Sequence, residues 1–189
     1  HLVPLHFWIE AREALDIIKP LYWLAECEDV RYFEAFDTTY AWAFMHATGS
    51  INRHEPNLNP VLKQLELYAS DGPATSKLLF TSNHDENSWN GTEYEKYGIA
   101  AKPWAVFTHT WKGLPLIYSG QELPNHQRLQ FFDKDCILFW RFFPKNPIYN
   151  SDFMRSSQAL NNFDFSNLIF SIFQHICQHQ NSFGSFFFS

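Results

Sequence analysis

A polar cluster follows a short apolar run near the middle of the chain. Residues 77–80 are followed by a run of polar and ionisable residues that includes Asn83, His84 and Asp85. A buried strand that delivers side chains into a site has this pattern. A carboxylate there can stabilise positive charge on a reacting carbon, and a neutral His84 can donate a hydrogen bond to a substrate hydroxyl. The structural alternative is an Asn-Asp turn with a capping role.

A second carboxylate, Glu26, follows the apolar run 21–25. A carboxyl group beside an apolar wall such as Trp23 would hold its proton more tightly, as a general acid must at neutral pH. Taken alone, Glu26 is better explained as part of a solvated turn with Glu28 and Asp29. Glu122, after a further apolar run, adds an acid at a third strand end, and barrel enzymes gather catalytic groups at such ends.

The elements that must position these residues alternate between helix and strand. The patterns predict helices over 4–18, 58–68 and 94–111, with a further helix beginning at 42–48, and strands at 21–25, 36–40, 77–81 and 114–118. Pro103 should kink the 94–111 helix or mark its true start, and 49–59 is expected to be a loop. This order predicts an α/β fold with a parallel sheet.

Composition narrows the function classes. The 189 residues are 46% hydrophobic, 18% charged and 19% aromatic, with a net charge of −6. Acidic character disfavours nucleic acid and anionic membranes as partners. Three widely spaced cysteines and histidines without ligand spacing predict no metal site. The start at His1 resembles neither a signal peptide nor a true N-terminus, so no compartment is predicted.

The character of the chain changes near residue 136. Twelve of the 20 phenylalanines lie between Cys136 and Ser189, in a segment rich in Asn, Ser and Gln. We therefore expect two parts: residues 1–135 as a catalytic-type fold and residues 136–189 as an atypical tail, either a lineage-specific extension or a non-native, out-of-frame end. The best helix candidate in the tail is 163–176.

Four segments resemble motifs of the α-amylase family of glycoside hydrolases. The segment 80–85 (Phe-Thr-Ser-Asn-His-Asp) is similar to the seventh-strand motif, 24–26 (Leu-Ala-Glu) to the fifth, 36–42 to the sixth, and 113–122 to the eighth strand and its loop. They occur in the family's order and cover roughly residues 1–135. The resemblance implies part of a (β/α)8 barrel, about strands 5–8, that acts on α-glucans with retention of configuration.

The resemblance also implies roles for individual residues. Glu26 matches the general acid/base, and Asp85 matches the carboxylate that stabilises the transition state and distorts the sugar. His84 matches the ligand of sugar hydroxyls on the non-reducing side of the cut, and Asn83 is expected to support substrate binding. No cofactor is expected; the family's calcium ligands would lie mostly outside this chain.

One family residue has no match here. The nucleophilic Asp would lie just before His1, upstream of Val3-Pro4. We therefore expect this chain alone to be inactive or nearly so. Two alternatives remain: a non-catalytic glucan-binding or interaction protein, and a truncated product without activity. The sequence separates neither α-1,4 from α-1,6 linkages nor hydrolysis from glycosyl transfer.

Overall fold

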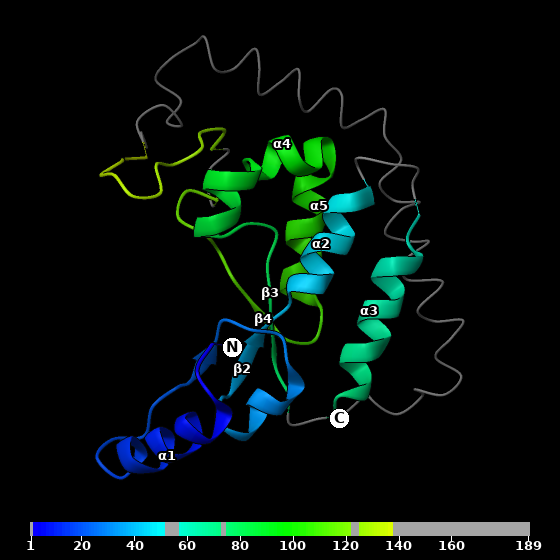
Figure 1. Cartoon of the computed structure of the whole chain (residues 1–189). Helices are drawn as coiled ribbons and strands as arrows, with labels where there is room; N and C mark the ends of the chain where they lie inside the picture. The colour runs from blue at the N-terminus through cyan, green and yellow to red at the C-terminus, as the bar shows by residue number, and fades with distance from the viewer. Residues whose placement is uncertain (1, 52–56, 73–74, 122–124, 138–189) are drawn as a thin grey trace. The chain divides into compact units, whose positions relative to one another are not determined.

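The computed structural model describes residues 2–51, 57–72, 75–121 and 125–137. Figure 1 shows these residues in colour. The helices are α1 (Leu5–Asp16), α2 (Trp42–Ile51), α3 (Asn59–Ser70), α4 (Glu93–Tyr97) and α5 (Ala101–Thr110), with shorter helical segments η1 (Val30–Glu34), η2 (Glu86–Asn90) and η3 (Gly98–Ala100). The strands are β1 (Leu24–Ala25), β2 (Thr38–Tyr40), β3 (Lys77–Leu79) and β4 (Leu114–Pro115).

The four strands form a parallel sheet in the order β1-β2-β3-β4. Leu24 pairs with Thr38 across β1 and β2, and Leu78 pairs with Leu114 across β3 and β4. Parallel neighbours in sequence order need a crossover between them, and α2 with α3 supplies the one between β2 and β3. All carboxyl ends of the strands therefore lie at one edge of the sheet. The predicted α/β class with a parallel sheet is confirmed.

Two element predictions need correction. The predicted single helix over 94–111 is divided into α4, η3 and α5, because Gly98 adopts φ +54° after α4. Pro103 lies in the first turn of α5, which confirms the prediction that it marks a helix start, and its missing N–H leaves no helical hydrogen bond unmade there. The expected loop over 49–59 begins later, because α2 continues through Ile51.

The first core cluster lies between α1 and the β1–β2 connection. Buried side chains form it, and α1 packs against it through Leu5, Trp8 and Ile9 at helical spacing. The buried members are Ala25, Cys27, Tyr32, Ala35 and Phe36. Phe7, Leu15 and Ile18, three apolar residues of the helix predicted over 4–18, remain exposed. They point away from the described core, although the helix itself is where the pattern predicts it.

The second core cluster lies at the centre of the sheet. Tyr40 from β2 packs with Leu78 from β3, Phe80 and Met45, and Trp42 covers them. The Tyr40 and Phe80 rings meet edge to face at 5.3 Å between centroids. This cluster packs at the ends of β2 and β3, and it therefore positions the start of the polar segment that follows β3.

Gly113 allows β4 to dock beside β3. Its φ of +138° is strained for other residues, and a Cβ there would lie 2.6 Å from the Lys77 carbonyl oxygen. The close approach of the two backbones explains why the α5–β4 turn carries glycine.

The tail residues from 138 onward, including the helix expected over 163–176, lie outside the described residues. Within the described ranges, no helix is both long enough and apolar enough to cross a membrane.

Candidate active site

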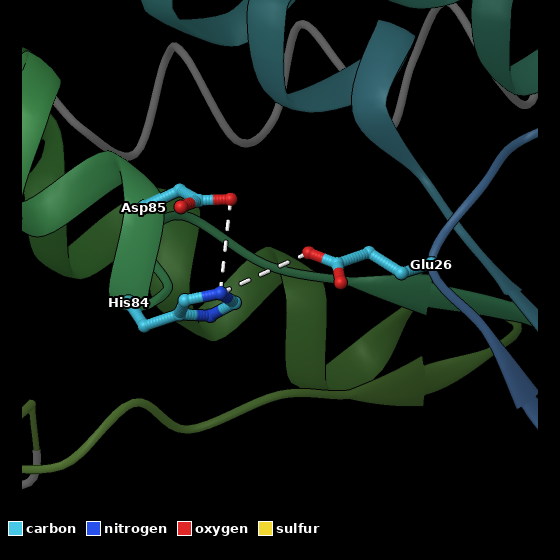
Figure 2. A group of neighbouring side chains, drawn as sticks. All are labelled: Glu26, His84 and Asp85. Atoms are coloured by element: carbon cyan, nitrogen blue, oxygen red, sulfur yellow. Dashed lines mark ion pairs between the residues drawn. The ribbon is translucent and has the colours of Figure 1, made fainter. Parts of the chain in front are cut away.

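Glu26, His84 and Asp85 converge at the carboxyl edge of the sheet (Figure 2). Glu26 follows β1, whereas His84 and Asp85 lie between β3 and η2. The His84 Nε2 atom lies 3.9 Å from a Glu26 carboxylate oxygen and 3.7 Å from an Asp85 carboxylate oxygen. The fold therefore brings Glu26 beside His84 and Asp85, which lie almost 60 positions further along the chain.

The three side chains are open to solvent. The side chains of Glu26 and His84 are each 51% exposed, and that of Asp85 is 39% exposed. The expected apolar wall is absent, because Trp23 points the other way, packs on Phe36 and donates its indole N–H to Asp16. Alternation along an extended segment accounts for this, since neighbouring side chains point to opposite faces. A substrate can reach all three groups.

The arrangement supports two kinds of chemistry. Glu26 can transfer a proton, while His84 and the Asp85 carboxylate can hydrogen-bond hydroxyl groups. The same three residues each offer one ligand atom, all within 4.8 Å of one another, so they could also share a cation. Exposed acidic groups commonly cluster without one, and the expectation of no metal here stays a prediction.

The acids that accompany Glu26 have structural contacts. Glu28 accepts hydrogen bonds from the Tyr68 hydroxyl and from the backbone N–H of Ala43 at the start of α2. Asp29 caps η1, and its hydrogen bonds with Arg31 lower the pKa of Asp29 to about 2. The solvated-turn alternative is therefore wrong for Glu28, whose two oxygens are engaged.

Asn83 is placed beneath the site. Its side chain is 1% exposed, and its Oδ1 accepts a hydrogen bond of 2.8 Å from the Glu86 backbone N–H. This is the capping role that the structural alternative predicted. Among the described residues, Asn83 Nδ2 and the neighbouring Ser82 hydroxyl have no hydrogen-bond partner. Direct contact of Asn83 with a substrate stays a prediction.

Helix α4 holds the segment that carries His84 and Asp85 at both ends. Before the segment, the Thr81 hydroxyl donates to Glu93 Oε1 at 2.7 Å, and Gln121 donates to the same oxygen at 3.1 Å. After it, Lys96 forms a buried ion pair with Glu86. Burial raises the pKa of Glu93, with its hydrogen bonds acting in the opposite direction. These contacts fix the backbone around the exposed pair.

Tyr40 is a site neighbour that the sequence reasoning did not single out. Burial raises the pKa of its hydroxyl, and the negative charges of Glu26 and Asp85 raise it further. It ends β2, the strand between those that carry the two carboxylates. Its position at a strand end was the available signal. Glu122, the third predicted strand-end acid, lies outside the described residues.

Two solved structures resemble this one. A noncanonic maltogenic alpha-amylase, AmyB, from Thermotoga neapolitana is 29% identical with a TM-score of 0.59, over 73% of this chain and 32% of that chain. An alpha-amylase from Lactobacillus plantarum is 25% identical with a TM-score of 0.63, over 72% and 37%. The chain thus spans about a third of the length of these proteins. No protein-family model matches it, and no curated protein matches it.

The likeness rests on shape and on sequence identity together. It covers nearly three quarters of this chain, more than the described sheet alone. Both similar structures are alpha-amylases, which is the family that the four sequence motifs resemble. Over part of their length, this chain is therefore similar to α-amylases in fold and in sequence.

Proposed function

We propose that this chain contributes the acid/base side of an α-glucan-processing site in an α-amylase-like (β/α)8 barrel. The convergence of Glu26, His84 and Asp85 at one sheet edge carries the proposal. The catalytic residues of (β/α)8 enzymes lie at this edge, on loops that follow different strands. Four parallel strands would be half of such a barrel.

Each of the three residues has a separate role in the proposed reaction. Glu26 donates its proton to the glycosidic oxygen as the bond to the anomeric carbon breaks. Asp85 stabilises the positive charge that develops on the sugar ring, and His84 donates a hydrogen bond to a ring hydroxyl. Glu26, now a carboxylate, later accepts a proton from water or from an acceptor sugar.

The proposed reaction retains configuration and needs a nucleophilic carboxylate. The Glu26 and Asp85 oxygens lie within 4.8 Å of each other. Asp85 is not the nucleophile of the proposed reaction, since its role is to stabilise the charge on the sugar ring, so a further carboxylate is required. We propose that the nucleophile comes from outside this sequence, since this chain matches only 32% and 37% of the similar α-amylases.

Calorimetric titration with maltoheptaose tests substrate binding. The purified chain is expected to bind it, and His84→Ala should weaken binding about tenfold through the lost hydroxyl contact. Glu26→Gln has the same shape and should still bind. Glu10→Gln on α1 is the matched control. Absence of binding by the unaltered chain contradicts the proposal.

Azide rescue tests the acid role of Glu26. Azide can attack the anomeric carbon in place of the nucleophile, while the leaving sugar oxygen takes the Glu26 proton. We expect slow formation of a glycosyl azide from maltoheptaose, lost in Glu26→Gln. A glucosyl fluoride donor needs no proton and should react equally in both proteins. Glycosyl azide formation that does not depend on Glu26 with either donor contradicts the assignment.

Hydrolysis without azide tests the origin of the nucleophile. The chain alone should release no more sugar than Glu26→Gln does. Hydrolysis above that control would show that the nucleophile lies within these 189 residues. Binding without any azide product would instead favour a non-catalytic glucan-binding protein.

A further inference from the structure

An exposed group of aromatic side chains lies beside the candidate active site. Trp89 comes from η2, and Phe131 and Phe132 come from the segment 125–137. Ring centroids are 5.2 Å apart for Trp89 and Phe131, and 4.7 Å apart for Phe131 and Phe132. Trp89 is 57% exposed and Phe132 is 84% exposed. We call these three residues the aromatic platform.

The aromatic platform is continuous with the site. The Phe131 ring stacks on the His84 ring at 5.9 Å between centroids, with an interplanar angle of 26°. The same imidazole faces Glu26 and Asp85 through its Nε2 atom. A ligand bound at His84 would therefore extend directly over Phe131 toward the more exposed rings.

Buried and backbone contacts hold the aromatic platform in place. Asn87, which is buried, accepts a hydrogen bond of 2.7 Å from the Leu129 backbone N–H, and Ser88 donates to the Leu129 carbonyl at 2.7 Å. Asp135 accepts a hydrogen bond of 2.9 Å from the Gln130 backbone N–H. The two contacts of Leu129 tie the segments together, and the Asp135 contact spans Phe131 and Phe132 within the segment 125–137. The aromatic surface is thus pre-formed, which reduces the entropy lost on binding.

The chemistry of the aromatic platform favours a neutral carbohydrate. Clustered exposed aromatic rings often mark binding sites, and their flat faces match the C–H faces of a pyranose ring. Leaving aside charges already paired, the segment 125–137 contributes Asp133 and Asp135 against Lys134. Negative charge repels anionic ligands, while sugar hydroxyls can donate hydrogen bonds to carboxylates.

We propose that the aromatic platform is an additional α-glucan subsite, which stacks a sugar unit next to the unit held by His84. The proposal rests on the proposed α-glucan function and extends it. It assigns Trp89 and Phe132 to recognition of chain length rather than to bond cleavage. Longer maltooligosaccharides should reach both His84 and the platform, whereas maltose should not span them.

Titration of platform variants with maltoheptaose and maltose tests this subsite. Phe132→Ala and Trp89→Ala should each weaken maltoheptaose binding about tenfold, an effect of the size of one lost aromatic contact, and should change maltose binding less than twofold. Trp89→Phe should retain most of the affinity. Phe7→Ala, which removes a similarly exposed ring from α1, is the matched control. Phe132 is so exposed that its loss should leave folding intact, as circular dichroism would verify.

Several outcomes would overturn the subsite. Maltoheptaose binding that is unchanged in both alanine variants would contradict the subsite. The proposed function would stand, because it depends on His84 and Glu26. Equal binding of cellohexaose argues against an α-glucan occupant. Self-association that is lost in Phe132→Ala, seen by sedimentation, would make the platform a protein interface instead. Platform-dependent binding without azide rescue would keep the subsite and remove the catalytic assignment.

Discussion

The two carboxylates of the candidate site follow strands that are held in place by different kinds of contact. Glu26 follows β1, at an edge of the described sheet, and its carboxylate contacts His84. Asp85 follows β3, inside the sheet, in a segment held by α4. Both ends of that segment are fixed by buried polar contacts.

The difference shows how a strand end can be positioned in two ways. Beside β3, the paired groups Glu86 and Lys96 are buried. A backbone movement that separated them would leave a buried charge without its partner, which costs free energy. Beside β1, Asp37 accepts partly exposed hydrogen bonds from Trp23 and Arg12, and beyond Glu26 the part-buried Glu28 accepts hydrogen bonds from Tyr68 and Ala43. We therefore expect the β3 side to be rigid and the Glu26 side to respond more easily to its surroundings.

Loss of the buried ion pair should have the largest effect. Lys96→Ala leaves the Glu86 carboxylate buried without its partner, which should lower the free energy of unfolding by about 3–5 kcal/mol. Urea denaturation measures the change. Nuclear magnetic resonance (NMR) signals of His84 should shift in the variant, because Glu86 lies two residues away.

Lys63→Ala, at an exposed position of α3, is the matched control for that variant. Its unfolding free energy should stay within about 0.5 kcal/mol of the unaltered chain. A loss below about 1 kcal/mol in Lys96→Ala would contradict the contrast between the two sides.

A smaller effect is expected on the β1 side. Asp37→Ala removes hydrogen bonds of 2.7 Å from Arg12 and 2.8 Å from the Trp23 backbone N–H. Both charged side chains are about a third exposed, so the loss should be about 1–2 kcal/mol. Amide hydrogen exchange at Leu24 and Ala25 should accelerate more than at Leu79. Equal acceleration at Leu79 would show that the two sides unfold together, and Asp133→Ala serves as the exposed control.

The smallest effect concerns a surface pair on the β3 side. Hydrogen bonds from Arg128, and then from the Thr92 backbone, lower the pKa of Glu95 to about 2. Arg128→Gln should raise the Glu95 pKa part of the way toward 4.5, because the Thr92 capping contacts remain. Carbon NMR titration of the carboxyl group measures the shift.

The pH dependence of that variant has a defined sign. A lowered carboxyl pKa stabilises the folded state above pH 4.5, and this contribution is lost as the pH falls toward 2. The difference in stability between Arg128→Gln and the unaltered chain should therefore be small, present near neutral pH and absent below pH 2. A difference that grows on acidification would contradict the Arg128 contribution.

The sequence predicted the convergence of the site because the signals are local. Apolar runs that end in polar residues indicate strand ends, and parallel strands bring those ends to one edge. For Glu26 the local pattern alone favoured a solvated turn, and the resemblance to α-amylase motifs was needed to predict Glu26, His84 and Asp85 in one site. The strand lengths were predicted too long, because apolar residues continue beyond the paired backbone at 21–25 and 114–118.

What the sequence did not predict depends on contacts between distant segments. Asn83 makes only a local contact with the Glu86 backbone, but α4 meets Thr81 and Glu86 only in three dimensions. The contacts that hold Trp23 away from Glu26, with Phe36 and with Asp16, form only in the folded chain. Periodicity reports which residues prefer burial, not which partner buries them.

The strand order has a consequence for the size of the site. β1 and β3 are separated by a single strand, so their backbones stand about 10 Å apart at two ladder spacings. Side chains from Glu26 and Asp85 close part of that width above Tyr40. The gap between two opposing groups in such a sheet can change only in steps of one strand, about 4.8 Å. The hydrogen-bond spacing between strands, rather than loop length, thus sets the width available to a bound sugar ring.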